Sequence, residues 1–590
     1  MGAIASLYKY TSIDNNDKKK MQDVMTSMHY RGVQTLDVNI DNCVLSQLNS
    51  FHNGFSKVYA YKDEIYVVAD TYITNKDSII EKIDSLGYEV TCSLDEELIA
   101  ILYKEFNKGF VEFVEGAFAI IIYDAKTKKM YIVRDRIGEK TLYYAEFPCG
   151  VVCSTELKTI LKQFINSPQI NYNALLSPVR FTGGIDKRNT FIEQIKRVEP
   201  GEIIVISNEA GALRNKYWER KRTYDNVEPE DKVKDTILQM IQSSVNNAMT
   251  SDKKVAVMLS GGIDSSAIAA LAKKGGYEVH TITAGYSGNQ AQDERDVAKR
   301  FASEQGFIYH ELEFTPEDYK KSFAELTDFL DEPMTDSTAI VQWMLFRKVK
   351  EMGFDILLGG MGGDELFYGY PAWNKLGDSL KLRRQHEAIF PFKGKKKEFI
   401  KFVLKNWKWL LSAGYPCKLE DKSYGWWIHD DYYKFIDKAT LKIDNEIIRL
   451  KDHKVYKSFA PCFIGKEVDF IYDDAIDTVM TQAYLYLTDR LAMAHNLEVR
   501  SPLLDAKLME YVMSLPLEMK YKPGKPKQFF KDILAGIVPD YILYAQKRGF
   551  TSPNSFINEA VNSYSYKCFE SDYKFYNSVL ADSILHKLLK

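Results

Sequence analysis

The feature that most constrains the fold of this chain is a short apolar run followed by a turn of small residues. Residues 255–259 are all apolar, which is typical of a strand buried on both faces of a parallel sheet. Residues 265–274 then read as a helix that ends at Gly275-Gly276. A strand, a tight turn and a helix in this order indicate an open α/β sheet, in which ligands bind at the carboxyl ends of the strands.

The turn itself reads Ser260-Gly261-Gly262-Ile263-Asp264-Ser265-Ser266. Its glycines let a ligand approach the backbone, and the helix that follows directs unpaired N–H groups and its positive dipole end at that ligand. The segment lacks the lysine of a Walker A loop and the three spaced glycines of a dinucleotide fingerprint. It resembles the SGGxDS loop of the ATP pyrophosphatases, which cleave ATP between the α- and β-phosphates and hold the released pyrophosphate. The alternative is a Ser/Gly-rich turn that binds nothing.

The second half of the chain continues with alternating strands and helices. Beyond the first strand and helix, we expect strands at 277–283 and 354–358 and helices at 293–304, 316–329 and 337–351. The last strand leads into five residues that include four glycines, and then into Asp364. Asp264 and Asp364 would meet at one sheet edge and could share one Mg²⁺ with ATP phosphates. The alternative for Asp364 is an acidic residue that only stabilises a helix N-terminus.

The first half of the chain has a different pattern, in which short β-like runs alternate with turns. We expect strands at 57–61, 64–69, 117–123, 130–134, 151–154 and 202–207, with helices at 75–87 and 93–108. Residues 1–6 match the minimal myristoylation pattern, but they also read as the first strand of a buried sheet, which we favour. The pattern predicts an α+β layered domain.

Two segments of this half carry a family resemblance. Residues 134–144 (RDRIGEKTLYY) and 154–158 (STELK) resemble the RDRxGxKPLYY and SExK segments of class II glutamine amidotransferases. The resemblance implies an Ntn-hydrolase-like αββα fold. In that family a Cys at position 2 is the nucleophile that takes ammonia from glutamine, and here the residue is Gly2, which offers no thiolate.

Other family positions have changed as well. The Asn-Gly pair that stabilises the oxyanion corresponds to Ala69-Asp70, and an anionic side chain there would repel the intermediate. Residues 43–49 contain no counterpart of the arginine that clamps glutamine, although Asp95 matches the acidic residue that grips its amine. We therefore predict a glutaminase-like domain without the activity. A nucleophilic Cys at a different chain start is the rival explanation, but Cys43 and Cys92 are internal and could not supply an N-terminal amine.

Four segments of the second half resemble the synthetase domain of asparagine synthetases, β-lactam synthetases and lasso-peptide cyclases. They occur in the family order: 331–333 (DEP), 362–370 (GGDELFYGY), 489–505 (DRLAMAHNLEVRSPLLD) and 547–550 (KRGF). The resemblance implies that a substrate carboxylate attacks the α-phosphorus of ATP, that pyrophosphate leaves, and that an amine displaces AMP to form an amide. The cofactors it implies are ATP and Mg²⁺.

The resemblance also assigns roles to particular residues. Lys527 matches the catalytic lysine of the family, whose cation would neutralise charge on the α-phosphate; without the family it would read as a solvated lysine. Asp264 and Asp364 would be the metal ligands. The ATP and pyrophosphate contacts would come from Leu259, Ser260, Gly261, Gly262, Asp264, Ser265, Ser266, Ala284, Gly360 and Lys547.

Two positions depart from the family pattern. Met361 stands where asparagine synthetases have Glu and β-lactam synthetases have Tyr, and a methionine cannot relay the proton of the amine. Ala545 stands where many relatives have Arg, which leaves one phosphate contact in doubt. Both changes weaken a plain asparagine synthetase assignment.

Length, charge and cysteine usage set the remaining expectations. A chain of 590 residues exceeds one ordinary core, and we divide it into a degenerate glutaminase-like domain (1–210), a linker (211–235) and an ATP-pyrophosphatase domain (236–590). The net charge of −3 favours neither nucleic acid nor membrane as a partner. Seven scattered cysteines fit a reducing compartment, and no apolar run of 18 residues occurs. We expect a cytoplasmic protein, with a homodimer as one option.

The segment 371–470 is where the resemblance fades, so we expect it to set substrate specificity. Within 371–420, twelve Lys and Arg residues outnumber four acids and are interleaved with aromatic residues. This composition suits an acidic or aromatic partner peptide, but an amphipathic helix over 398–411 with solvated lysines explains it as well.

The leading hypothesis is an ATP- and Mg²⁺-dependent amide ligase that does not use glutamine. Its substrate is a small-molecule or peptide carboxylate, and the preferred reaction is intramolecular lactam formation, with a precursor peptide and a protease as partners. Ammonia-dependent asparagine synthesis and a non-catalytic ATP-binding scaffold are the alternatives.

Overall fold

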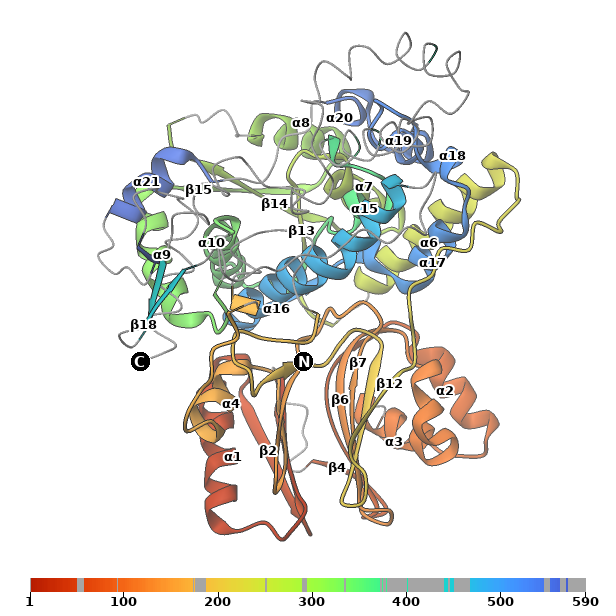
Figure 1. Cartoon of the computed structure of the whole chain (residues 1–590). Coiled ribbons are helices and arrows are strands. Elements are labelled where there is room, and N and C mark those ends of the chain that lie inside the picture. Colours follow the sequence, from red (N-terminus) through yellow and green to blue (C-terminus); the bar gives the residue numbers. More distant parts are fainter. Residues whose placement is uncertain are drawn as a thin grey trace.

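In the computed structural model, the chain forms an N-terminal part and a C-terminal part that lie against each other (Figure 1). Each part is built of sheets and helices. It describes residues 2–49, 58–92, 94–172, 174–175, 187–249, 252–288, 294–333, 336–371, 374, 378, 401, 440–443, 446–449, 467–545, 552–562 and 569–570. Among these residues, no helix combines the length and the apolar character that crossing a membrane requires.

Two six-stranded antiparallel sheets lie face to face in the N-terminal part (Figure 1). The first contains, in spatial order, β10 (Lys196–Arg197), β8 (Tyr143–Phe147), β9 (Gly150–Ser154), β1 (Gly2–Lys9), β3 (Cys43–Asn49) and β2 (Gln34–Ile40). The second contains β12 (Gly211–Lys216), β11 (Glu202–Ser207), β7 (Lys129–Arg134), β6 (Gly116–Asp124), β5 (Ile65–Ile73) and β4 (Tyr59–Tyr61). Apolar side chains from both sheets form one buried core between them.

Helices cover the outer faces of these two sheets. The first sheet carries α1 (Asn15–Ser27) and α4 (Leu157–Phe164), and the second carries α2 (Lys76–Ser85) and α3 (Asp95–Phe106). Short 3₁₀ turns follow α1 and α3, namely η1 (His29–Arg31) and η2 (Asn107–Glu112). β1 is buried along nearly its whole length because it has a core on each face. The predicted αββα layering is confirmed.

A five-stranded parallel sheet forms the centre of the C-terminal part. Its strands, in spatial order, are β15 (Ile308–Phe314), β14 (His280–Tyr286), β13 (Val255–Met258), β16 (Ile356–Leu358) and β19 (Glu498–Arg500). One face packs against α6 (Glu230–Met249), α7 (Ile263–Lys274), α8 (Arg295–Gln305), α17 (Ala506–Ser514) and α19 (Gln528–Leu534). The other packs against α9 (Pro316–Phe329), α10 (Thr338–Glu351), α16 (Leu485–Met493) and α21 (Asn554–Asn562). This confirms the predicted doubly wound α/β sheet.

The sequence prediction lacked two strands of the parallel sheet. β15 is an edge strand whose exposed and half-buried residues alternate with no continuous apolar run. β19 has three residues and pairs with β16 from far along the chain, so no local pattern marks it. Both strands form because a neighbouring strand offers unpaired backbone groups.

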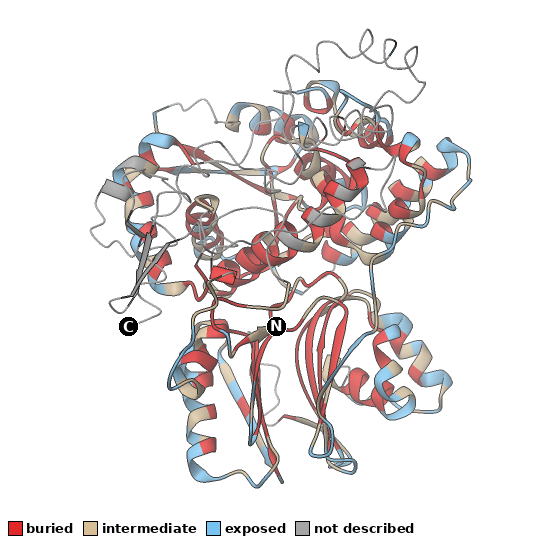
Figure 2. Ribbon diagram, viewed as in Figure 1, coloured by how far each residue is buried: buried red, intermediate tan, exposed pale blue. Residues whose placement is uncertain are grey.

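One long helix of the C-terminal part lies at the boundary with the N-terminal part. It consists of α15 (Glu467–Ala475), a π-helical stretch η5 (Ile476–Tyr484) and α16. Every residue of α16 is buried, because the parallel sheet lies on one side and the N-terminal sheets lie below it (Figure 2). Through this helix, the two parts share one continuous interface.

Smaller elements complete the described chain. They are α11 (Gly363–Leu366), η6 (Pro502–Leu504), α18 (Leu517–Lys520), α20 (Asp540–Leu543) and a three-stranded sheet of β18 (Glu446–Arg449), β17 (Thr440–Ile443) and β20 (Phe569–Glu570). The interval 211–235 contains β12 and the first turns of α6, and the proposed domain boundaries stay predictions. Most of the segment 371–470 lies outside the described residues, including all of the predicted helix at 398–411 except residue 401. The segment 547–550 also lies outside them.

Candidate active site

The predicted pyrophosphate loop forms a tight turn between β13 and α7. Gly261 has φ +76°, a conformation that residues with a side chain rarely adopt. The hydroxyl of Ser265 donates to the carbonyl of Gly262 at 3.2 Å and lies 3.0 Å from the hydroxyl of Ser260. No side chain caps the N-terminus of α7, so its first N–H groups face the turn without such a partner. This geometry suits an anion.

Ser266 adds a second sign of a missing ligand. Its side-chain oxygen is buried and has no hydrogen-bond partner among the described residues. Buried hydroxyls are normally paired, because an unpaired one forfeits its bonds to water. A phosphate oxygen would satisfy this group.

The glycine-rich segment after β16 brings the second carboxylate to the loop. A Cβ atom on Gly360 would lie 2.8 Å from the Cβ of Asp264, and one on Gly363 would collide with the carboxylate of Asp264. Only glycines therefore allow this segment to approach the loop so closely. Asp264 and Asp364, a hundred positions apart in the chain, thus come together and contact the same cationic group, whereas their predicted sharing of Mg²⁺ stays a prediction.

That cation is the ammonium group of Lys527. Its Nζ lies 2.5 Å from the carboxylate of Asp264 and 2.7 Å from Oδ1 of Asp364. Lys527 is 6% exposed, so the interpretation as a solvated lysine is wrong. Burial lowers its pKa, but the two carboxylates outweigh burial and raise the pKa to about 12. The lysine is therefore a buried, charged group held between two acids.

The two carboxylates also fit a divalent cation. Both offer oxygens to a single positive charge, which is the donor set that Mg²⁺ prefers. Among the described residues, no cluster of three or more His, Cys, Asp or Glu residues could hold a metal ion. A magnesium ion here would need further oxygens, which phosphates and water supply.

Sequence reasoning missed one acidic group at this centre. Glu365 is buried, and burial together with the charge of Asp364 raises its pKa. Its carboxyl accepts a hydrogen bond of 2.7 Å from the hydroxyl of Tyr370. Both residues lie in the 362–370 motif, which could have suggested them. Met361, by contrast, packs against the apolar core.

The other predicted nucleotide contacts lie at the carboxyl ends of strands. The carbonyl of Leu259 accepts from Thr283 Oγ1 at 2.7 Å, and Ala284 follows Thr283 in β14. Gly360 lies beside Asp264. The structure thus brings these residues to one edge of the sheet, while Lys547 lies outside the described residues. Their roles stay predictions.

Position 2 of the N-terminal part, where the amidotransferase family has its nucleophilic Cys, is a glycine and holds no nucleophile. The backbone N–H of Gly2 donates to Asp70 Oδ1 at 3.2 Å. A Cβ atom on Gly2 would collide with the backbone carbonyl of Leu48 and would lie 3.3 Å from the Cα of Asn49. Asp95, the one match to the glutamine site, is paired with Lys76 at 2.6 Å. A side chain at position 2 would require the backbone to move.

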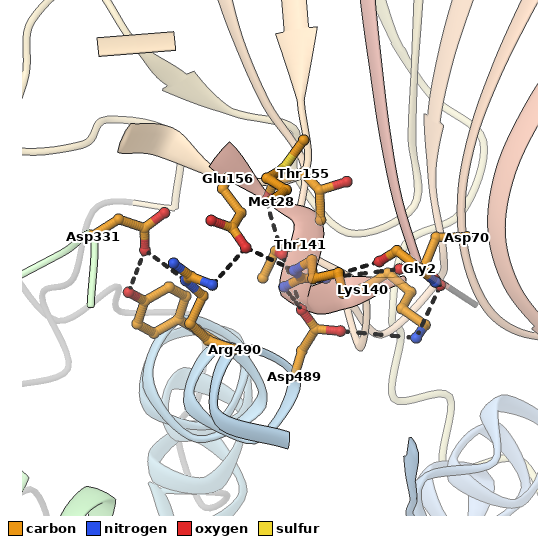
Figure 3. A network of polar contacts seen from close by, with 12 residues as sticks. Gly2, Met28, Asp70, Lys140, Thr141, Thr155, Glu156, Asp331, Asp489 and Arg490 are labelled. Atoms are coloured by element: carbon orange, nitrogen blue, oxygen red, sulfur yellow. Dashed lines mark hydrogen bonds and ion pairs between the residues drawn. The ribbon is translucent and has the colours of Figure 1, made fainter. Parts of the chain in front are cut away.

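Ion pairs fill the space beside Gly2 (Figure 3). Arg31 lies 2.7 Å from both Glu156 and Asp489, and Lys140 lies 3.3 Å from Asp70. We call the buried side chains of Arg31, Asp70, Lys140, Glu156, Asp331, Asp489 and Arg490 the interface network.

The interface network joins the two parts of the chain. Arg490, on α16, pairs with Glu156 of the N-terminal part and lies 3.3 Å from Asp331. Sequence reasoning missed Arg31, because its partner Asp489 is 458 positions away and no local motif marks it. The network therefore occupies the space beside Gly2, between the two parts of the chain.

Comparison with known proteins assigns both parts of the chain. Residues 236–589 match the Asparagine synthase family, and residues 1–218 match the Glutamine amidotransferase domain. Two asparagine synthetases [glutamine-hydrolyzing] of Bacillus subtilis, numbers 1 and 3, are each 28% identical to the chain. The matches cover 84% and 82% of this chain and 77% and 75% of those proteins.

A fungal relative is similar over an even larger share of the chain. The amidase chry2 of Gibberella zeae is 24% identical over 571 residues, which cover 90% of this chain and 82% of that protein. The predicted family resemblance and enzyme class are confirmed. The chain belongs to the asparagine synthase family, whose members are ATP-dependent ligases that form carbon–nitrogen bonds and release AMP.

Proposed function

We propose that this ligase activates a carboxylate as an acyl-adenylate and joins it to an amine that does not come from glutamine. The observation that carries the proposal is the environment of Gly2. This residue has no nucleophile, has no space for a side chain, and lies beside the carboxylate of Asp70. An oxyanion forming there would meet the negative charge of Asp70, and the neighbouring cations Arg31 and Lys140 already pair with carboxylates.

The first step would take place at Lys527, Asp264 and Asp364, whose charged groups we call the Lys527 centre. An oxygen of the substrate carboxylate attacks the α-phosphorus of ATP, and the bond from that phosphorus to pyrophosphate breaks. The N-terminus of α7 and the hydroxyl of Ser266 would hold pyrophosphate, since the N-cap Gly262 offers no side-chain cap and the hydroxyl has no hydrogen-bond partner among the described residues. Mg²⁺, held by Asp264 and Asp364, would neutralise phosphate charge when bound.

Lys527 would change partners during this step. Its ammonium now neutralises Asp264 and Asp364. With these two carboxylates engaged in holding Mg²⁺, Lys527 would direct its ammonium at the α-phosphate instead. A buried cation stabilises developing negative charge more strongly than a solvated one, because the local dielectric is lower. The lysine would therefore act as an electrostatic catalyst.

In the second step an amine attacks the acyl carbon and AMP leaves. The amine must lose a proton, and Met361 cannot accept it. Glu365 is an alternative, because it follows Asp364 in the chain and its raised pKa makes its carboxylate a better base. We assign the proton transfer to Glu365 and the hydroxyl of Tyr370 to its orientation.

The amine most consistent with a non-functional glutaminase site is one on the substrate itself. Ring closure then gives a lactam or macrolactam, as in lasso-peptide cyclases, and the partners would be a precursor peptide and its protease. A second candidate is asparagine synthesis from free ammonia. It is favoured by the Bacillus subtilis relatives, which are asparagine synthetases.

Exchange of labelled pyrophosphate into ATP tests the activation step directly. Exchange that depends on a carboxylate substrate supports the proposal, and ATP binding without exchange for any carboxylate would favour a non-catalytic scaffold. Mass spectrometry of the product separates the two candidates. Ring closure lowers the substrate mass by one water, whereas asparagine formation adds nitrogen from ammonium. Release of glutamate from glutamine at a rate that matches turnover would contradict the proposal.

A further inference from the structure

A cavity of about 300 Å³ lies between the N-terminal sheets and the C-terminal part. Its walls come from β5, β6 and η2 on one side and from α6, η6 and α17 on the other. Its lining includes Tyr72, Glu139, Trp218, Arg500 and Ala506. None of the three charged residues of the Lys527 centre lines it, so it is a separate space.

Acidic residues outnumber basic ones around this cavity. The acids are Glu112, Glu115, Glu139, Asp505 and Glu510, and the bases are Arg136, Arg500 and Lys507. The bases are already engaged: Lys507 pairs with Glu115 at 2.6 Å, and Arg500 with Glu498 at 2.6 Å. Arg136 donates to the carbonyl of Val111 at 3.3 Å and also to that of Val114. The wall of the cavity therefore contains two more acidic side chains than basic ones.

Glu139 is a half-buried acid of the cavity wall. Within the described part of the chain, its carboxylate forms no ion pair and accepts no hydrogen bond. Burial and the nearby charges of Asp135 and Asp505 raise its pKa to about 8, and Lys140 opposes this only in part. A partly buried carboxylate in such surroundings would be stabilised by a cation placed in the cavity.

Aromatic rings line the same space. The guanidinium of Arg500 stacks 4.0 Å from the ring of Tyr72, so this ring already faces one cation. Trp218 donates its indole N–H to Glu510, which fixes the plane of its ring at the wall. Aromatic faces attract organic cations as well as apolar groups. A volume of this size suits a small organic molecule.

We propose that the cavity binds a small organic ammonium ion. Its charged nitrogen lies against Glu139, and its organic part lies against Tyr72 and Trp218. The site joins residues of both parts of the chain and is independent of the proposed reaction. It also lies close to the Lys527 centre, because Leu504 lines the cavity and contacts Gly362, two residues before Asp364.

The test is calorimetric titration of the full chain with 2-phenylethylammonium, in the absence of ATP and acyl substrate. We expect saturable binding at one site, with at least about tenfold weaker binding in Glu139→Gln, which removes the charge but keeps the shape. Ala506→Phe should also weaken binding, because the larger side chain occupies the cavity. Glu209→Gln is the matched control: it removes the same charge from an exposed turn and should leave binding unchanged.

Thermal unfolding of each variant checks that it folds. The two site variants act by charge and by volume, so a folding defect in one leaves the other as a test. Absence of saturable binding to the wild type would overturn the proposal, as would undiminished binding in the folded site variants. Displacement of the amine by MgATP would place it at the nucleotide site instead and would also overturn the proposal. A chain without ligase activity that still binds the amine would separate this inference from the proposed function.

Discussion

The Lys527 centre and the interface network are both buried clusters of cations and carboxylates, yet they differ in how completely their groups are paired. At the Lys527 centre one ammonium serves two carboxylates, and the neighbouring hydroxyl of Ser266 has no partner among the described residues. In the interface network, Arg31 alone contacts Glu156 and Asp489 and hydrogen-bonds the carbonyl of Gly2.

The pKa of a buried acid is shifted in opposite directions at the two clusters. The pKa of Glu365 is raised, because burial and the charge of Asp364 outweigh its hydrogen bond from Tyr370. The pKa of Asp489 is lowered, because Arg31 and Lys140 outweigh burial. Unpaired groups cost stability but can bind a ligand, whereas paired groups stabilise the fold and leave nothing for a substrate. We infer that the first cluster is kept for chemistry and the second for structure.

The largest expected effect is that of removing one carboxylate from the Lys527 centre. Asp364→Asn should lower pyrophosphate exchange by at least about 10²–10³-fold, because the proposed metal ligand and one of the two partners of Lys527 are lost together. Thermal unfolding should change little. Asp252→Asn, at an 83% exposed side chain near β13, is the matched control and should retain full exchange. Exchange at the wild-type rate in Asp364→Asn would contradict the metal assignment.

A substitution in the interface network should instead lower the stability of the fold. Arg31→Met leaves Glu156 and Asp489 buried without their shared partner, and we expect a loss of about 3–5 kcal/mol in the free energy of unfolding, measured with urea. Lys187→Met breaks a pair with Asp477 in which both side chains are 38% exposed, and it should cost at most about 1 kcal/mol. Equal losses in the two variants would show that the network is not a structural unit.

These two regions also differ in how far the sequence predicts them. The Lys527 centre is built from residues that follow strands or lie in dense motifs, so strand order alone brings Asp264 and Asp364 together. The sequence does not show that Lys527 is buried, since a lysine in a basic stretch is usually solvated. Its environment depends on glycines that admit the second loop, and that packing is a tertiary property.

The interface network lies beyond sequence reasoning for a different reason. The sequence predicts the absence of a nucleophile at Gly2 and the presence of an acid at Asp70. It does not predict that Arg31 reaches Asp489, because this pairing requires α16 to lie on the N-terminal sheets. Long-range ion pairs carry no periodicity, so only the assembled fold shows that the space is filled.

Lys527→Gln tests whether the lysine acts by its charge. We expect exchange to fall by about 100-fold, because the phosphate charge would then be met by a neutral group. Lys527→Arg keeps the charge and should recover part of the activity. The measurement is exchange at saturating ATP, with affinity for ATP determined separately. If Gln and Arg variants were equally impaired, shape rather than charge would be the important property of this side chain.

Gly2→Cys tests whether restoring the nucleophile restores glutamine hydrolysis. We expect no glutamate release and a loss of about 1–3 kcal/mol in stability, because the new Cβ collides with the carbonyl of Leu48. The double variant with Asp70→Asn removes the repelling charge and should still be inactive. Glutamate release is measured enzymatically and stability by urea unfolding. Hydrolysis by either variant would mean that the glutaminase site can still form.

The smallest expected effect concerns acid stability, and it follows from the two lowered carboxyl pKa values of the interface network. Arg490 and Lys158 outweigh burial at Asp331, as Arg31 and Lys140 do at Asp489, so both carboxyls titrate below their usual range. A carboxyl whose pKa is lower in the folded state stabilises the protein above its unfolded value of about 3.9, and this contribution disappears as pH falls through the folded-state pKa. The wild type should therefore lose stability progressively as the pH falls below about 4. Arg31→Met should show a shallower decline, because Asp489 then has a pKa closer to its unfolded value. Urea unfolding between pH 3 and pH 6 measures both slopes, and identical slopes would mean that the pairing of Arg31 with Asp489 does not persist in solution.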